Sequence, residues 1–320
     1  MDDGPTGYDM QMAWRNIQAF LPIEYQIGPG CMPVEAWWDW RGHRLHLDRF
    51  PVPASPVKVI LFHGVGSNGR QMSTILGAPL ARSGLETVAI DMPGYGVTQV
   101  ARGVTVTYDD WVAAANDFID AELARDKRPI ILCGLSAGGM LTYHAAVLNR
   151  KVKGIVGMTF LDQRIQQVGD ETAFNKAMNR LGTPLIRLAP RVGLGSVRIP
   201  MRLASKMRAL VNNKAALRAC YADKSSAGNW VSAAFLASYS RYSPAVEPEA
   251  FDICPILLTQ PAEDRWTPLH LSDLFLNRIT KVPVKRVLLA RAGHYPIEQP
   301  GLRQMHDEIM SFARGGVGLS

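Results

Sequence analysis

Residues 129–139 read PIILCGLSAGG, and this stretch decides the fold. Its first six residues form a short apolar run of the kind found in buried parallel strands. From Ser136 to about Leu148 the pattern is helical. The G-x-S-x-G motif at 134–138 therefore lies where a strand ends and a helix begins. Such a sharp turn strains the serine backbone and lifts its hydroxyl to a helix N-terminus, where the dipole favours negative charge. Ser136 is thus predicted to be a nucleophile.

Strand-like and helix-like segments alternate on both sides of this turn, which predicts an α/β fold with a mostly parallel central sheet and helices on both faces. The other expected parallel strands are 58–62, 85–91, 152–160, 253–260 and 284–290. The other expected helices are 71–83, 108–125, 269–279 and 300–313. Two more strand-like runs, at 34–40 and 43–50, are joined at Arg41-Gly42 and are typical of a hairpin.

The alternation stops at Asp162, and until residue 250 only helix-like stretches occur, such as RLASKMRALVNNKAALRAC at 202–220. The predicted organisation has four parts, namely an N-terminal extension at 1–34, a core at 35–161, a helical cap at 162–250 and the rest of the core at 251–320. The extension is expected to contain an amphipathic helix over 8–21, because apolar residues recur there at helical spacing, at Met10, Trp14, Ile17 and Leu21.

The composition is that of an ordinary globular protein, with 320 residues of which 47% are hydrophobic and 20% charged. No apolar run reaches the ~18 residues of a membrane span. The start, MDDGPTGYDMQ, lacks the pattern of a secretory signal. The four cysteines have no metal-site or disulfide-framework spacing, and two lie in apolar strand-like runs. A reducing cytoplasm fits this usage best.

The net charge of +7 is concentrated in one segment. Residues 162–250 hold 13 Lys+Arg and 6 Asp+Glu, whereas the rest of the chain holds 22 of each sign. This segment lacks a nucleic-acid-binding motif, so no nucleic acid partner is expected. A solvated helical surface is the favoured interpretation. The alternative is attraction of anionic substrates or weak contact with an anionic lipid surface.

A nucleophilic serine needs donors for an oxyanion and a histidine base that a carboxylate orients. His63-Gly-Val-Gly66 follows the strand at 58–62, so the backbone amides of Val65 and Ala137 are the predicted oxyanion donors. His63 itself is expected to brace the loop. DMPGYG at 91–96 predicts a tight turn in which Asp91 bonds the local backbone.

Among the seven histidines, only His294 follows a strand near the C-terminus and lies in a turn, so it is the predicted base. Asp264, after the strand at 253–260, is the predicted acid. Glu263 is adjacent, but a strand-end turn aims one of the two inward. Asp162 is the other position where the acid could stand. The order Ser, Asp, His matches this class of site.

HGVG, DMPGYG, GLSAGG, PAEDRWTP and GHYPIEQPG, in this order, resemble the α/β-hydrolase superfamily over about 35–161 and 251–315. The resemblance implies a serine hydrolase that cleaves a small-molecule carboxylic ester through an acyl-enzyme, without a metal or organic cofactor. It is similar to the esterase, monoacylglycerol lipase and lysophospholipase branches. Thioesterases, lactonases, cofactor-free haloperoxidases, carbon–carbon hydrolases and a non-catalytic receptor stay open as alternatives. Ser136 argues against the haloalkane dehalogenase and epoxide hydrolase branches, which have Asp there.

The cap is expected to select the substrate. Four aromatic residues lie in an apolar stretch before Pro244, namely Trp230, Phe235, Tyr239 and Tyr242. The last three stand at i, i+4 and i+7, so one helical face could line an acyl pocket. Plain packing of the same stripe is the favoured interpretation. The sequence does not indicate the oligomeric state.

Overall fold

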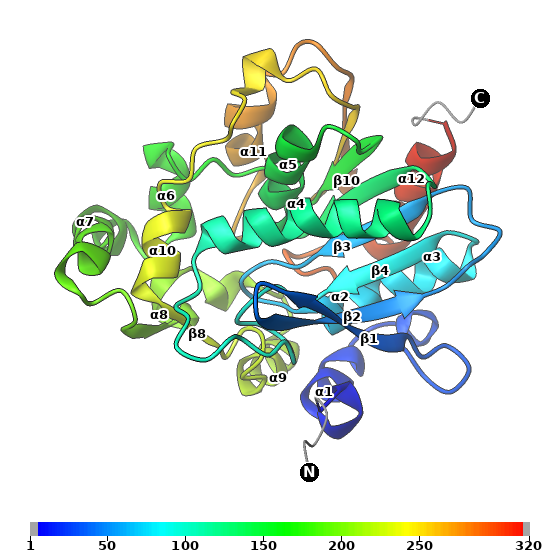
Figure 1. Ribbon diagram of the computed structural model, residues 1–320, viewed down its shortest axis with the longest axis horizontal. Coiled ribbons are helices and arrows are strands. Elements are labelled where there is room, and N and C mark those ends of the chain that lie inside the picture. The colour runs from blue at the N-terminus through cyan, green and yellow to red at the C-terminus, as the bar shows by residue number, and fades with distance from the viewer. Residues whose placement is uncertain (1–5, 316–320) are drawn as a thin grey trace.

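The computed structural model describes residues 6–315 of the chain. Its central sheet has eight strands in the spatial order β1-β2-β4-β3-β5-β6-β9-β10 (Figure 1). The strands are β1 Val34–Trp40, β2 His43–Phe50, β3 Lys58–Phe62, β4 Glu86–Ile90, β5 Ile130–Gly134, β6 Gly154–Gly157, β9 Ile256–Pro261 and β10 Val284–Leu289. β1 pairs antiparallel with β2, and β2 with β4, whereas the pairings from β4 through β10 are parallel. The prediction of a mostly parallel sheet is confirmed.

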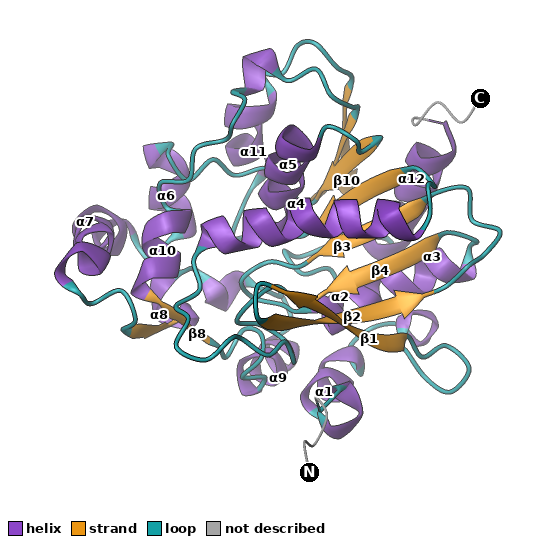
Figure 2. Cartoon of the chain, viewed as in Figure 1, coloured by secondary structure: helices purple, strands orange, loops and turns teal. Residues whose placement is uncertain are grey.

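Helices cover both faces of this sheet (Figure 2). The core helices are α2 Gly69–Met72, α3 Ala78–Arg82, α4 Tyr108–Arg125, α5 Ala137–Asn149, α11 Leu269–Leu276 and α12 Gly301–Gly315. α4 packs on α5 across one face, and α3 contacts α12 on the other. The helix expected over 71–83 is broken by a wide turn at Ser73–Gly77, because Pro79 lacks the N–H that would bond the preceding turn.

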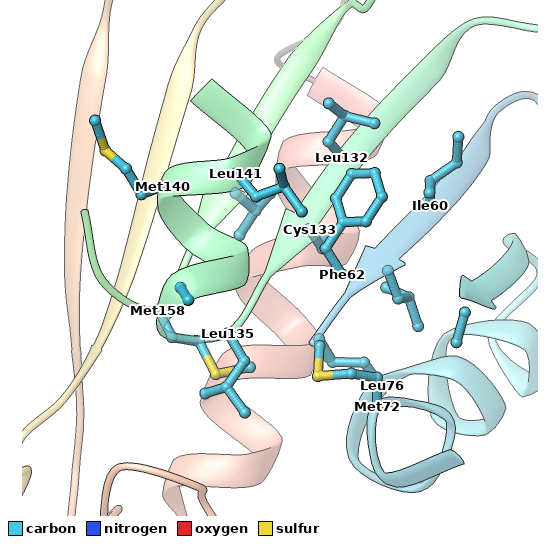
Figure 3. Packing of buried hydrophobic residues seen from close by; sticks show 14 of the residues in the cluster. Ile60, Phe62, Met72, Leu76, Leu132, Cys133, Leu135, Met140, Leu141 and Met158 are labelled. Atoms are coloured by element: carbon cyan, nitrogen blue, oxygen red, sulfur yellow. The ribbon is translucent and has the colours of Figure 1, made fainter. Parts of the chain in front are cut away.

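The sheet is buried on both faces where it supports the turn at Ser136. Every residue of β3 and β5 is buried, as the continuous apolar runs at 58–62 and 130–134 predict. Figure 3 shows Phe62 and Leu132 of these strands packed with Leu141 of α5. Each fully buried side chain of this size contributes ~1.5–3 kcal/mol, so the strand-to-helix turn rests on a rigid base.

The N-terminal helix was predicted too long. In place of one helix over 8–21 there are a 3-10 turn at Tyr8–Met10 and a short helix α1 at Ala13–Gln18. Trp14 and Ile17 are buried, but Met10 is 80% exposed. The reason is that Tyr8 takes the inward position: its hydroxyl donates to Asp91 at 2.9 Å, and its carbonyl accepts from the Trp14 indole at 3.0 Å.

Residues 162–250, between β6 and β9, are here called the insert segment. Its elements are α6 Gln166–Thr172, η4 Met178–Gly182, α7 Thr183–Leu188, η5 Ala189–Val192, β7 Arg198–Pro200, α8 Met201–Ala204, η6 Met207–Ala209, α9 Lys214–Ala222, β8 Trp230–Ser232, α10 Ala233–Tyr239 and η7 Pro248–Ala250. The expectation of a purely helical segment was wrong, because β7 and β8 pair antiparallel. The stretch 202–220 is also not one helix, since the Asn213 side chain caps a new helix, α9.

The insert segment lies beyond the carboxyl ends of the parallel strands, where α6, α7, α8 and α10 gather at one end of the molecule (Figure 1). This is the edge at which open α/β sheets bind their ligands. Across residues 6–315, helices with the length and hydropathy needed to span a bilayer are absent.

Candidate active site

Ser136 lies in the turn between β5 and α5 and has a strained backbone conformation. Its φ of 56° and ψ of −120° are rarely adopted by residues with a side chain. The close approach of neighbouring backbone enforces this turn: a Cβ on Gly138 would lie 2.4 Å from the carbonyl oxygen of Phe62 and 2.6 Å from that of His63. Strain of this kind, held by close packing, is typical of functional positions.

The loop after β3 lies directly against Ser136. A Cβ on Gly64 would lie 2.7 Å from the Ser136 Cβ and 2.8 Å from the Leu135 carbonyl oxygen, so only glycine fits there. Val65 and Ser136 border the same cavity. Neither the Val65 amide nor the Ala137 amide donates a hydrogen bond to another residue within 6–315. Both amides are therefore unpaired donors beside the serine.

His63 holds this loop in place. Its Nε2 accepts from the Met92 amide at 2.9 Å, which leaves the proton on Nδ1 to be donated to the Gly64 carbonyl at 2.9 Å. Burial lowers the pKa of His63 and keeps the ring neutral. Asp91 likewise accepts from the backbone amides of Gly69 and Val97, at 2.6 and 3.0 Å. Both residues occupy the bracing positions that the sequence predicts for them.

The turns after β9 and β10 bring Asp264 and His294 together. The Asp264 Oδ2 lies 2.9 Å from the His294 Nδ1, and both side chains are buried. The other Asp264 oxygen, Oδ1, accepts from the amides of Trp266 and Thr267, each at 2.8 Å. Burial alone would raise the pKa of Asp264, but the charge and hydrogen bond of His294 and the Thr267 donors hold it below its ordinary value.

The structure separates Asp264 from the two other acids considered. Glu263 is exposed, whereas Asp264 is buried, so the turn aims only Asp264 inward. Asp162 is also buried, but its carboxylate binds the guanidinium of Arg164 at 2.7 Å. The guanidinium of Arg164 also forms an ion pair with the carboxylate of Glu247, at 2.7 Å. Asp162 is thus engaged in an ion-pair chain away from His294.

His294 has one nitrogen that is free to react. Nδ1 faces Asp264, whereas Nε2 is buried and has no hydrogen-bond partner among the described residues. A buried polar atom without a partner is costly, which makes such an atom a marker of function. The indole of Trp266 lies on the imidazole, with ring centroids 4.6 Å apart, and restricts its orientation.

A cavity of about 120 Å³ opens beside Ser136, between the strand ends and the insert segment. Leu161, Trp266 and Thr267 line it from the core. Its other walls come from the insert segment, which contributes Gln163, Gly169, Thr172, Ala173, Met178, Asn179, Gly182, Thr183, Ile186, Met201, Ala204, Ser205, Leu236, Tyr239 and Ser240. We call it the inner cavity. Most of the lining is apolar, which suits an acyl chain.

Of the four aromatic residues predicted to line an acyl pocket, only Tyr239 borders the inner cavity. Trp230 and Phe235 border a separate hollow beside Pro93, and Trp230 is 47% exposed. The Tyr242 ring packs against the His144 ring, with centroids 4.6 Å apart. α10 ends at Tyr239, so Tyr242 lies beyond the helix, but Phe235, Tyr239 and Tyr242 all pack on the ring of Tyr108, as the favoured packing interpretation expects.

Trp266 and Thr267, for which the sequence predicts no role, also belong to this site. Trp266 packs on His294 and lines the inner cavity. The Thr267 hydroxyl donates to Asp264 Oδ2 at 2.7 Å and lies 3.0 Å from His294 Nδ1. Their position, two and three residues after the predicted acid in PAEDRWTP, was the available signal, because such a turn folds back on its own carboxylate.

A second buried polar cluster lies away from this site, between β1, β2 and α2. Glu35, His46 and Asp48 have possible ligand atoms within 4.8 Å of one another, which is a metal-like grouping. Arg70 occupies its centre: its guanidinium donates to Asp48 at 2.6 Å and to Glu35 at 3.0 Å. The arginine cation already balances the carboxylates, so the donor set fits an internal ion-pair network better than a metal.

The fold and the strained serine between β5 and α5 define an α/β hydrolase. The sequence matches the family described as "Serine aminopeptidase, S33" over residues 54–300, and the chain therefore belongs to this family of hydrolases. The predicted superfamily and the prediction of an enzyme of the hydrolase class are confirmed.

Several solved structures and curated proteins that are similar to the chain are named as lipases or esterases. A monoglyceride lipase from Saccharomyces cerevisiae superposes with a TM-score of 0.73 at 18% identity, covering 94% of this chain and all of that one. The carboxylesterase CesB from Bacillus subtilis gives 0.59 at 15% identity, covering 96% and 97%. Protein phosphatase methylesterase 1 from Mus musculus is 25% identical over 104 residues, which is 32% of this chain and 27% of that protein. The chain thus matches about a quarter of this relative's length.

Proposed function

We propose that the protein is a serine hydrolase that cleaves carboxylic esters of small amphiphilic molecules. The observation that carries the proposal is the buried His294, which is bonded to Asp264 on one side and has an unpartnered Nε2 on the other. An imidazole oriented by a carboxylate is the base that a serine nucleophile requires. The esterase and lipase names of the similar proteins support an ester as substrate.

In the proposed mechanism, His294 Nε2 takes the proton of Ser136 while the serine Oγ attacks the ester carbonyl. Asp264 stabilises the imidazolium and keeps the Nδ1 proton in place. The amides of Val65 and Ala137 donate to the oxyanion, at the N-terminus of α5 where the helix dipole adds to their effect. His294 then protonates the leaving alcohol, and water releases the acid from the acyl-enzyme. These steps need no metal or organic cofactor.

We propose that the insert segment, residues 162–250, acts as a cap that selects the acyl group. It provides most of the lining of the inner cavity, and those walls are largely apolar. A cavity of this kind favours an aliphatic acyl chain over a charged one. The core parts at 35–161 and 251–320 supply the reacting groups.

We also propose that the enzyme works in a reducing compartment such as the cytoplasm. All four cysteines are free thiols, and three of them, Cys133, Cys220 and Cys254, are buried. Burial raises the pKa of Cys220 and of Cys254 to about 12, so these thiols are unreactive. Their role is packing, which needs no oxidising environment.

The test is hydrolysis of p-nitrophenyl esters of graded chain length, with the matching thioesters and p-nitroanilides. We expect turnover of the esters, and a loss of about 10⁴–10⁶ in rate when Ser136 is replaced by Ala. The family description makes amides the informative control. If the protein hydrolyses the anilides but not the esters, amide hydrolysis would replace ester hydrolysis as the proposed function. Activity that survives Ser136→Ala would refute the mechanism.

A further inference from the structure

The insert segment exposes many large apolar side chains. Eight of them lie within residues 178–203, each between 47% and 72% exposed: Met178, Leu181, Leu185, Leu188, Val192, Leu194, Val197 and Leu203. Single exposed apolar residues are ordinary, but a continuous patch of them is typical of an interaction surface.

The patch is ordered along one helical stretch. η4, α7 and η5 follow one another without a gap from Met178 to Val192. Steps of three and four residues place five apolar side chains on one face, namely Met178, Leu181, Leu185, Leu188 and Val192. Gly182, Thr183 and Ile186, on the other side, border the inner cavity. Met178, at the start of the stripe, also borders the inner cavity, whereas the helical wall separates the cavity from the rest of the stripe.

The charged residues within this part of the sequence are all of one sign. Between Glu171 and Asp223 the sequence contains ten Lys+Arg and no Asp or Glu. Nine of these ten side chains are exposed, the exception being Lys206. Within residues 6–315, only Arg180 among the ten forms an ion pair, with Asp170 at 2.8 Å. The positive charge is thus largely uncompensated, in contrast to the paired arginines of the core.

Basic and apolar residues run side by side on the helical stretch. Arg180, Arg187 and Arg191 each directly precede a residue of the stripe, so they lie along one flank of it. Apolar residues beside a basic flank are the pattern of a helix that lies in a lipid headgroup region. The stretch 176–206 contains no aromatic residue on which a nucleic-acid base could stack. The pattern therefore favours lipid over nucleic acid.

A second hollow borders the same helical stretch as the inner cavity. It has a volume of about 320 Å³, and Arg164, Arg180 and Arg187 border it. It shares Gln163, Gly169, Asn179, Thr183 and Ser240 with the lining of the inner cavity. The polar hollow and the apolar cavity are therefore neighbours at the same helical stretch, an arrangement that suits a molecule with a polar head and an apolar chain.

We propose that residues 176–206 are a docking face for an anionic lipid surface, from which the enzyme takes an amphiphilic ester into the inner cavity. The stripe enters the headgroup region, and the flanking arginines contact lipid phosphates and carboxylates. The second half of this proposal rests on the proposed ester hydrolysis, whereas the docking itself does not.

Docking is tested with the full chain carrying Ser136→Ala, so that no turnover alters the lipids. Vesicles of phosphatidylcholine, with or without 30% phosphatidylserine, are pelleted at low and high salt. We expect co-sedimentation with the anionic vesicles at low salt, weakened at high salt because the screening length falls from about 30 Å at 0.01 M to about 3 Å at 1 M. Absence from the anionic pellet at low salt overturns the proposal, as does equal binding to both vesicles. Binding to an RNA oligomer in place of vesicles also overturns it.

Matched variants test whether residues 176–206 form the docking face. Leu185→Ser is expected to weaken binding about ten-fold, because a leucine no longer enters the headgroup region. Arg191→Gln is expected to weaken it about five-fold, since each basic residue near the surface contributes a factor of that order. Leu148→Ser and Arg102→Gln, which change exposed residues outside the insert segment, should bind as the parent does. Equal losses in the controls would contradict this location.

Turnover separates docking from catalysis. In the protein with Ser136 restored, Leu185→Ser should leave kcat/KM for a water-soluble acetate ester unchanged, because Leu185 does not line the inner cavity. Its rate on an ester embedded in anionic vesicles should fall about ten-fold. Loss of both rates would contradict a docking role. Vesicle binding without any turnover would refute the proposed function and leave docking intact.

Discussion

The floor and the roof of the inner cavity differ in how tightly they are held. The floor lies at the strand ends, where Ser136 borders the cavity and where Trp266 and Thr267, which also line it, contact His294 and Asp264. Ser136, Asp264 and His294 are all at most 7% exposed. The roof is the insert segment, whose helical stretch from Met178 to Leu188 contains no buried residue. Packing therefore fixes the proposed reacting groups, whereas the residues of the insert segment that face the inner cavity and the solvent can change at little cost in stability.

This difference predicts that changes in the floor alter rate and that changes in the roof alter selectivity. The largest effect is expected for Asp264→Asn, which should lower kcat about 10³–10⁴-fold because the imidazole loses its orientation and counter-charge. Asp162→Asn, at an equally buried acid that binds Arg164, should cost less than about ten-fold. Steady-state kinetics on one ester compares them. Losses in the reverse order would assign the acid to Asp162.

A smaller loss of kcat is expected when the loop beside Ser136 is displaced. In Gly64→Ala the added Cβ would lie 2.7 Å from the Ser136 Cβ, so the loop that carries the Val65 amide must shift. Loss of one oxyanion donor costs about 10²–10³ in kcat. Gly28→Ala, where nothing lies within 4 Å of the new Cβ, is the control. Unchanged kcat in a folded Gly64→Ala protein would remove Val65 from the oxyanion site.

The roof is tested by substitutions at two neighbouring positions of the same helix, one that borders the inner cavity and one on the exposed stripe. Ile186→Trp fills space in the inner cavity and should lower kcat/KM for long-chain esters about ten-fold relative to the acetate ester. Leu185→Trp, one residue away on the exposed stripe, should leave the ratio of long-chain to acetate rates unchanged for soluble substrates. The readout is the chain-length profile of each variant. Identical profiles would mean that the acyl chain binds elsewhere.

The smallest expected effect is on the free energy of unfolding, and it comes from His46, which lies outside both regions. Burial would lower the pKa of His46, but its contacts with Asp91 and Glu35 raise it to about 9. An unfolded histidine has a pKa near 6.5. The stabilising charge is therefore fully present below about pH 6.5 and is lost as the pH rises through about 9. Urea unfolding between pH 6.5 and 9.5 should show this decline, and a His46→Asn variant should show a flatter curve. Parallel curves would contradict the assignment.

Much of the floor could be predicted from the sequence because it depends on local rules. The strand-to-helix turn at Ser136 and the strand ends at Asp264 and His294 follow from short apolar runs and turn residues. The choice of Asp264 over Glu263 needed the turn geometry, which exposes one and buries the other. The contact of Thr267 with Asp264 had a signal in their spacing, but its contact with His294 could not be foreseen, because the hydroxyl meets His294 only once two separate turns are folded together.

The roof was predicted less well for physical reasons. Its elements are short, and β7 pairs with β8 across 29 intervening residues, which local propensity does not reveal. The aromatic stripe at Phe235, Tyr239 and Tyr242 packs on Tyr108, in agreement with the favoured packing interpretation, although α10 stops at Tyr239. Helix ends are set by caps and tertiary contacts, and both are weak signals in an apolar segment.

The most direct test of the central claim is covalent labelling by a fluorophosphonate, followed by mass spectrometry of the digested protein. The reagent reacts with a serine only where a base and oxyanion donors activate it. The predicted result is a single adduct on Ser136 that disappears in Ser136→Ala and is strongly slowed in Asp264→Asn. An adduct on another residue, or an unlabelled protein that nevertheless turns over esters, would contradict the claim that Ser136, His294 and Asp264 carry the reaction.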